Sequence, residues 1–221
     1  MMFVAMLRAQ WVWTRAIMLF FLAAGFALPV LSVPMSARFG IGWISANGYV
    51  EVGGMIGLLV AITVCLAAVA LVVQNWSVDD RGRHVYALSL PIARRRYLLY
   101  RLGGGFLLLG MLAVAVWLGG AVAAGLLELP ESLHAYPASL ALRALMAAWL
   151  VHAIGFLVRF GAGQRARGVV FGALILLFLF VLLPAETLPA PLTWLSLASR
   201  ALVLPGGPFG ILVSPWSFID V

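Results

Sequence analysis

The chain has 221 residues, of which 65% are hydrophobic and only 10% are charged, and its formal net charge is +7. Soluble domains carry about 25% charged residues, and a soluble core formed by a chain of this length cannot bury so much apolar surface. The composition therefore excludes an ordinary soluble domain. It predicts an all-α, polytopic membrane helix bundle that forms a single transmembrane domain over residues 1–221.

The first residues of the chain mix aromatic, apolar and basic side chains. Within residues 2–14, Trp11 and Trp13 stand close to Arg8. This mixture predicts a short helix at the membrane interface, or else an N-terminal extension of the first span. Five apolar stretches are then predicted to cross the bilayer. They cover residues 16–33, which end at Pro34, then 49–73, 97–127, 140–160, and 169–183, which end at Pro184.

The C-terminal part, residues 184–221, is predicted to form an outer re-entrant segment and tail. Residues 192–204 are apolar, but they contain Arg200 and run into the sequence PGGP. A break of this kind exposed to lipid would leave backbone groups without hydrogen bonds. The pattern favours a re-entrant or interfacial pair of short helices, and the alternative is a broken sixth span over residues 192–213.

The distribution of arginine predicts the orientation of the chain. With a cytoplasmic N-terminus, only Arg38, Arg143 and Arg200 of the fourteen basic residues lie outside. Basic residues accumulate on the cytoplasmic side of membrane proteins, so this orientation is favoured over the reverse one, and a bacterial inner membrane is the expected location. The arginines on the inner side are Arg8, Arg15, Arg81, Arg83, Arg94, Arg95, Arg96, Arg101, Arg159, Arg165 and Arg167.

All fourteen basic residues are arginine, so the chain has no lysine. A Walker A loop needs a lysine to reach the nucleotide phosphates, and a Schiff base needs one as well. Basic residues are not interleaved with aromatic ones in a stripe suited to nucleic acid. We therefore expect no enzyme activity, no cofactor and no nucleic-acid partner for this chain.

Candidate ligands and acids are scattered along the chain. The histidines are far apart in sequence, and Cys65 is the only cysteine, so no metal site is predicted. His152 falls within a predicted span, where an interhelical hydrogen bond is its expected role. Glu51 and Glu186 lie near the outer ends of two spans, where they line an outer vestibule of a conduit or are simply solvated span ends.

Glycines recur at spacings typical of helix packing in membranes. Small residues three or four positions apart let helices approach closely in lipid. The chain has such pairs at Gly53 and Gly57 and at Gly168 and Gly172, and it has a run at Gly103–Gly105 followed by Gly110. The pattern fits a compact bundle or a dimer seam.

The charged loop between the second and third spans has the most specific pattern. It reads "DDRGRHVYALSLPIARRRYLLYR" from Asp79 to Arg101 and holds six of the fourteen arginines. The run "VYALSL" is too short to cross a membrane, and Pro91 follows it. This run is suited to a short helix on the inner membrane face, with Tyr97 and Tyr100 as interfacial anchors. The alternative is an inert loop that only fixes topology.

This loop resembles the one between spans two and three in permease subunits of type-2 ATP-binding-cassette exporters. The residues that carry the resemblance are Asp79 and Asp80, Gly82, "YALSLPIAR" and "RRYLLYR". Arg83 stands where the family usually has threonine, and Arg101 where a lysine often enters the third span. In the family this loop is a coupling helix seated on a separate ATPase, which binds the ATP and magnesium.

The resemblance implies a function and a set of partners. It implies that residues 76–96 couple to an ATPase subunit, that residues 2–14 brace the same partner, and that a second permease copy or a homologous permease completes the conduit. The family has six spans, and this sequence has no clear sixth span. The implied coupling residues are Asp79, Asp80, Arg81, Gly82, Arg83, His84, Pro91, Arg94, Arg95, Arg96 and Tyr97.

Two other functions are compatible with the sequence. One is a structural subunit that scaffolds a larger membrane complex without transport. The other is an ion-coupled carrier, whose transport would depend on a gradient and on Glu51 or Glu186. An exporter permease driven by a separate ATPase is the leading expectation, because the loop pattern favours it over both alternatives.

Overall fold

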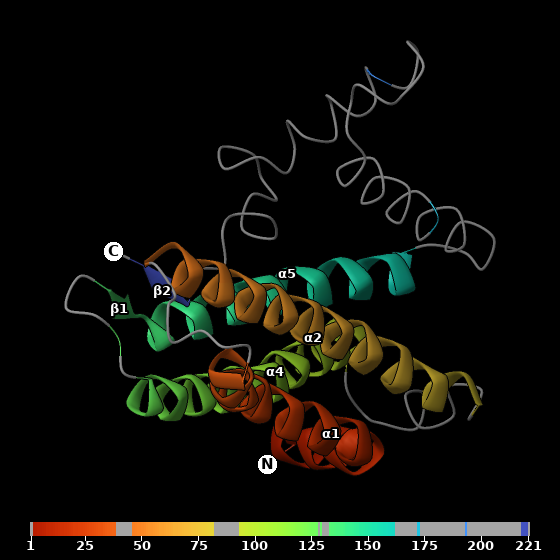
Figure 1. Ribbon diagram of the computed structural model, residues 1–221. Helices are drawn as coiled ribbons and strands as arrows, with labels where there is room; N and C mark the ends of the chain where they lie inside the picture. Colours follow the sequence, from red (N-terminus) through yellow and green to blue (C-terminus); the bar gives the residue numbers. More distant parts are fainter. Residues whose placement is uncertain are drawn as a thin grey trace. The chain divides into compact units, whose positions relative to one another are not determined.

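The computed structural model describes four long helices and one short pair of strands (Figure 1). The helices are α1 (Met2–Arg38), α2 (Ala46–Arg81), α4 (Arg94–Leu126) and α5 (Pro137–Gly161), and the strands are β1 (His134–Ala135) and β2 (Ile219–Asp220). The described residues are 2–38, 46–81, 93–127, 129, 133–161, 172, 193 and 218–220.

The chain divides into two compact units. The first combines Met1–Phe156 with Trp216–Val221, and the second is Leu157–Pro215. The described part of the second unit is the end of α5, residues 157–161, together with residues 172 and 193, which are helical. The packing described below is that of the first unit.

Each of the four helices is long and apolar enough to cross a membrane, and this identifies the chain as a multi-pass membrane protein. Four of the five predicted spans are thereby confirmed as membrane-length helices. The fifth predicted span and the C-terminal stretch 192–213 lie outside the described residues, apart from Gly172 and Thr193. The candidate spans are Met2–Leu31, Gly53–Ser77, Arg95–Leu126 and Pro137–Arg159.

The first helix is longer than the sequence predicts. Residues 2–14 and the first span form one continuous helix, and that helix passes Pro29 and Pro34 and ends at Arg38. The prediction that it ends at Pro34 is wrong. A proline lacks one N–H and disturbs the bond to the carbonyl four residues earlier, but in apolar surroundings a helix still satisfies the remaining backbone groups.

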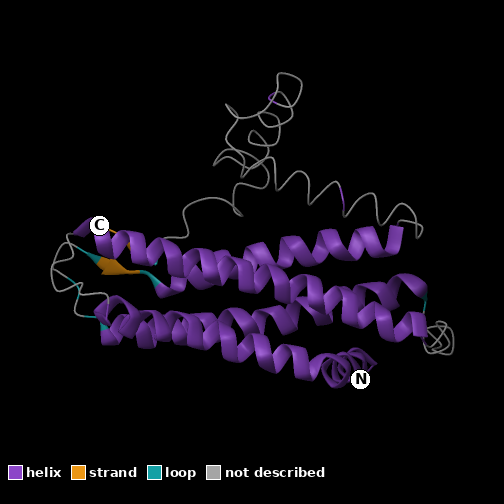
Figure 2. Ribbon diagram, turned by 45° about the vertical axis from the view of Figure 1, so that its right-hand side comes forward, coloured by secondary structure: helices purple, strands orange, loops and turns teal. Residues whose placement is uncertain are grey.

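The helices alternate in direction within the first unit (Figure 2). The rings of Phe3 on α1 and Tyr100 on α4 lie 5.6 Å apart, and further along Gly25 packs against Leu112, so these two helices run the same way. α2 runs opposite to α1, because the Gln74 side chain near its end donates a hydrogen bond to the Trp13 carbonyl.

The fourth long helix packs through side chains. The Trp149 indole N–H of α5 donates to the Phe106 carbonyl of α4 at 3.1 Å. The ring of Phe156 lies 5.7 Å from that of Trp76 on α2. These contacts place α5 antiparallel to α4. We call the end where α1 and α4 begin and α2 ends the polar end, and the opposite end the strand end.

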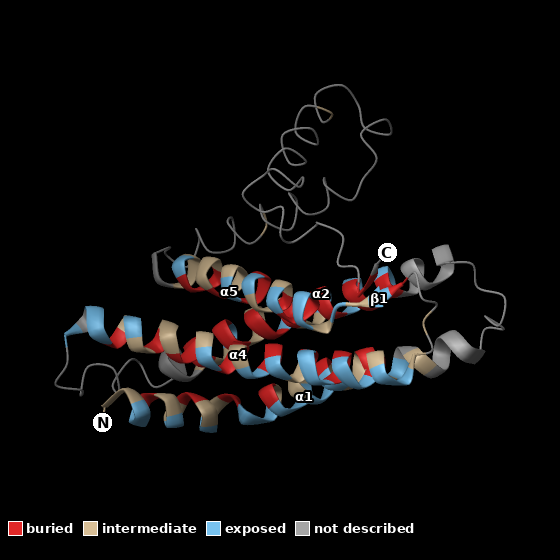
Figure 3. Cartoon of the chain, turned by 90° about the vertical axis from the view of Figure 1, so that its left-hand side faces the viewer, coloured by how far each residue is buried: buried red, intermediate tan, exposed pale blue. Residues whose placement is uncertain are grey.

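Buried residues occupy the sides of the helices that face one another (Figure 3). Large aliphatic side chains fill this core, and small residues allow the helices to approach. A methyl group at Gly119 of α4 would lie 2.9 Å from the Phe26 Cα of α1. The largest fully buried apolar side chains include Met18, Val60, Leu71, Leu109, Leu112 and Val116.

The strand end is closed by residues that the sequence does not predict to be ordered together. β1 and β2 are antiparallel, with His134 opposite Asp220 and Ala135 opposite Ile219. The Tyr136 N–H donates to the Phe218 carbonyl at 2.9 Å, and the Phe218 side chain is fully buried. Two-residue strands have no periodic pattern, so residues 128–137 were expected only as a polar turn.

Candidate functional site

Polar residues from three helices meet at the polar end of the first unit. We call this group the polar cluster; it consists of Gln10 and Trp13 from α1, Asn75 and Trp76 from α2, and Tyr97 and Arg101 from α4. Its centre is Arg101, of which only 2% is exposed. A buried arginine needs hydrogen-bond partners that replace water, and the cluster provides them.

Hydrogen bonds join Arg101 to all three helices. Its Nη1 donates to the Tyr97 hydroxyl at 2.7 Å, and its Nη2 donates to the backbone carbonyl of Asn75. The Gln10 side-chain amide donates in turn to the Arg101 carbonyl at 2.9 Å. The start of α4 is therefore tied to the end of α2 and to the first turns of α1.

Three aromatic rings surround the guanidinium. The Arg101 Cζ lies 5.2 Å from the centroid of the Trp13 ring, 5.6 Å from that of Trp76 and 5.7 Å from that of Tyr97. The negative face of an aromatic ring attracts a cation, and more strongly where water is excluded. This arrangement stabilises a positive charge at the place where the helices of the unit converge.

Local sequence explains how the cluster forms. Tyr97 and Arg101 are four residues apart on α4, so their side chains lie on one face of the helix. Asn75 and Trp76 come near the end of α2, and Gln10 is followed by Thr14, whose hydroxyl donates to the Gln10 carbonyl at 2.8 Å. Each helix thus supplies one polar turn at the same level.

The predicted coupling residues lie next to this cluster in sequence. Asp79, Asp80 and Arg81 are the last residues of α2, and Arg94–Arg96 begin α4, so the charged segment is helical at both of its ends. Arg95 and Arg96 are exposed, while Tyr97 is buried within the polar cluster. Gly82, Arg83, His84 and Pro91 lie outside the described residues, as do the side chains of Asp79, Asp80, Arg81 and Arg94.

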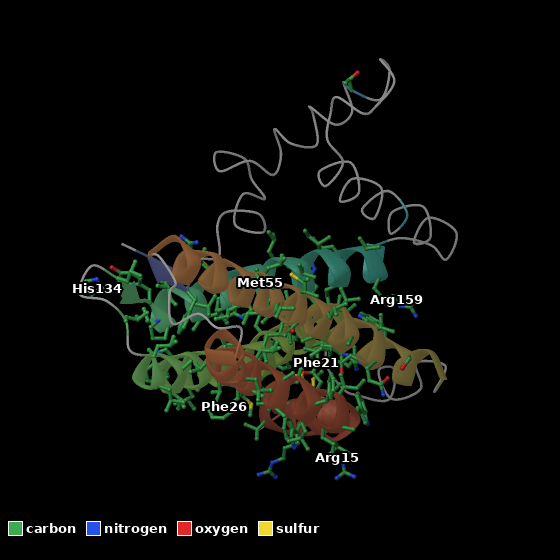
Figure 4. The ribbon with its side chains drawn as sticks, in the orientation of Figure 1. Arg15, Phe21, Phe26, Met55, His134 and Arg159 are labelled. Atoms are coloured by element: carbon green, nitrogen blue, oxygen red, sulfur yellow. The ribbon has the colours of Figure 1, made fainter. Side chains whose placement is uncertain are left out.

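The predicted vestibule residues are not placed together. Glu51 belongs to α2, and its side chain lies outside the described residues, as does Glu186 altogether. His134 is exposed in β1 at the strand end (Figure 4). In the part of the chain that the structure describes, no three His, Cys, Asp or Glu residues could hold a metal ion.

His152 is the polar residue buried between the middle turns of α4 and α5. It is 1% exposed, its ring lies 5.8 Å from the Phe106 ring, and it packs against Gly105. The backbone of Ala68 on α2 faces the imidazole, but no described atom meets hydrogen-bond distance and angle at either ring nitrogen. The predicted interhelical hydrogen bond is therefore not found among the described residues.

Sequence reasoning missed the polar cluster as a site. It treated Arg101 as one of many topological arginines and Tyr97 as an interfacial anchor, and it assigned no role to Gln10 or Asn75. A usable signal was present. Gln10 and Asn75 are uncharged polar residues beside tryptophans, and polar side chains within membrane helices are expensive unless they contact one another.

Comparisons with known proteins add no name. No family model matches the chain, and neither the curated proteins nor the solved structures include a significant match. The class that the fold defines is a multi-pass membrane protein with a buried, caged arginine at one end of its helices.

Proposed function

We propose that the chain is the transmembrane subunit of an ATP-binding-cassette exporter, coupled to a separate ATPase through residues 76–96. In this proposal the N-terminus is cytoplasmic, and a second permease copy or a homologous permease completes the conduit. The ATPase partner binds ATP and magnesium. The apolar spans favour a hydrophobic or amphipathic cargo over a bare ion.

The observation that supports this proposal most is the position of the polar cluster beside the charged segment. Asn75 lies seven residues before Gly82, and Tyr97 lies three residues after Arg94. Both are bonded to Arg101. A partner that moves the charged segment therefore acts on α2 and α4 through short, helical connections.

The same cluster extends the connection to the first helix. Gln10 and Trp13 of α1 contact Arg101, so displacement at the start of α4 also acts on α1. Helices are stiff over several turns and transmit movement along their length. Three membrane-length helices would then respond together to an event at one end, as an ATP-driven permease requires.

Co-purification tests the partner. The tagged full chain is isolated from its native membrane in mild detergent, and we expect an ATPase with a Walker lysine to accompany it. Replacing Arg94–Arg96 by glutamine should weaken that association by about tenfold or more, since charge pairs at interfaces contribute strongly. Arg143→Gln, on α5 near the strand end, is the matched control and should leave the association unchanged.

The positive-inside rule makes a second variant necessary. Replacing Arg94–Arg96 by lysine keeps the positive charge that holds the segment in the cytoplasm but loses the planar, bidentate guanidinium. We expect this variant to insert normally and to bind the ATPase at an intermediate level. If no ATPase accompanies the wild-type chain, the proposal is wrong, and a scaffold subunit or a gradient-driven carrier takes its place.

A further inference from the structure

A groove lies between α1 and α4, on a face that the polar cluster does not use. Its volume is about 360 Å³, within the range of about 300–1,000 Å³ that is usual for small-molecule sites. Leu107 and Met111 on its α4 side are 51% and 47% exposed, so the groove opens outward. The lining residues are Leu7, Arg8, Trp11, Leu107, Leu108 and Met111.

The lining combines an apolar wall with one positive charge. Four of its six residues are leucine or methionine, Trp11 adds an indole N–H, and Arg8 is an exposed arginine. No acid occurs anywhere in α1, and none lines the groove. The groove therefore offers an apolar channel with a cation at its rim, and an anionic amphiphile has the matching chemistry.

The depth of the groove strengthens this argument. Leu107 and Met111 are eleven and fifteen residues beyond Arg96 on the same helix, which is about 16 and 22 Å along its axis. An arginine beside an apolar wall at that level must reach towards the headgroups or pair with an anion. A lipid phosphate satisfies the guanidinium bidentately, as carboxylates and phosphates do elsewhere.

We propose that the groove between α1 and α4 binds one anionic phospholipid. An acyl chain lies along Leu107, Leu108 and Met111, and the phosphate accepts hydrogen bonds from Arg8, with the Trp11 indole beside it. The proposal needs only that the chain spans a membrane. It does not rest on the exporter function, and it stands or falls separately from the ATPase experiment.

Native mass spectrometry of the full chain in detergent micelles tests the headgroup. The probes are phosphatidylglycerol and phosphatidylcholine with identical acyl chains. Arg8→Gln should lower binding of phosphatidylglycerol by about tenfold, because a charge-assisted hydrogen bond is lost, and it should barely change the weaker binding of phosphatidylcholine. Arg15→Gln is the matched control: Arg15 is exposed on the same helix and projects away from it (Figure 4), but it does not line the groove.

A second pair of variants tests the groove itself. Leu107→Trp should fill the groove and reduce binding of phosphatidylglycerol by about tenfold. Leu118→Trp, at a similarly exposed position further along α4, should not reduce it. Glycerol phosphate, which carries the anion without acyl chains, should fail to compete. Equal losses for Arg8→Gln and Arg15→Gln, unchanged binding for Leu107→Trp, or competition by glycerol phosphate would overturn the proposal.

Discussion

The two ends of the α1–α4 pair are held together by different physics. At the polar end, Gln10 donates a hydrogen bond to the Arg101 carbonyl, and the Trp13 ring stacks near the guanidinium. At the strand end, Gly119 lies directly against the backbone of Phe26. Side chains at the polar end can rotate and exchange partners, whereas the strand-end contact depends on the absence of a side chain.

This difference indicates which end can move. Hydrogen bonds between membrane helices contribute about 0.6–2 kcal/mol each, so the polar end can rearrange at moderate cost. Backbones in contact separate only if the whole interface opens. The strand end therefore acts as the fixed side of the pair, and the polar end, next to the charged segment, is the adjustable side.

The largest expected effect breaks the fixed side. A methyl group in Gly119→Ala would lie 2.9 Å from the Phe26 Cα and collide with the Phe26 carbonyl, neither of which can rotate away. We expect the free energy of unfolding to fall by about 3 kcal/mol, measured by titration with sodium dodecyl sulfate in mixed micelles. Gly110→Ala on the same helix meets nothing within 4 Å and is the control; equal stability of the two variants would contradict a rigid strand end.

An intermediate effect is expected midway along α4. A methyl group in Gly105→Ala would lie 2.6 Å from the His152 Cε1, but an imidazole can shift, so we expect a loss of only about 1.5 kcal/mol. His152→Ala in the same chain should restore much of that loss, because it removes the colliding ring. A double-mutant cycle measures this coupling, and strictly additive losses would show that the two residues do not touch.

The smallest effect is expected at the adjustable side. Tyr97→Phe removes the hydroxyl that accepts from Arg101 but leaves the ring that faces the guanidinium. The free energy of unfolding should fall by about 1 kcal/mol, the usual contribution of one hydrogen bond. Tyr100→Phe, three residues further along the same helix, is the control; in the described contacts its ring packs on Phe3. A loss as large as that of Gly119→Ala would remove the distinction between the two ends.

Composition and span lengths were sufficient to predict the helices, because lipid leaves a chain few ways to satisfy its backbone. The predicted starts of the third and fourth spans fall within three residues of α4 and α5. Pro34 misled the prediction of the first helix end, since proline disfavours a helix locally but does not prevent one whose other bonds remain.

The polar cluster was only partly predictable. The charged segment pointed to the correct end of the molecule, and Tyr97 was named for a different reason. The meeting of Gln10, Asn75 and Arg101 could not be predicted, because they are 91 and 26 residues from one another's partner in the chain. No periodic pattern encodes which turns of three separate helices share a level.

The sequence by itself determined that this chain belongs in a membrane, which stretches are helical and where the arginines concentrate. Hydrophobicity and backbone hydrogen bonding decide these features locally. Only the tertiary structure decided that Arg101 is caged by Trp13, Trp76 and Tyr97, and that Phe218 closes the strand end. Those contacts depend on helix packing, in which side chains distant in sequence compete for the same space.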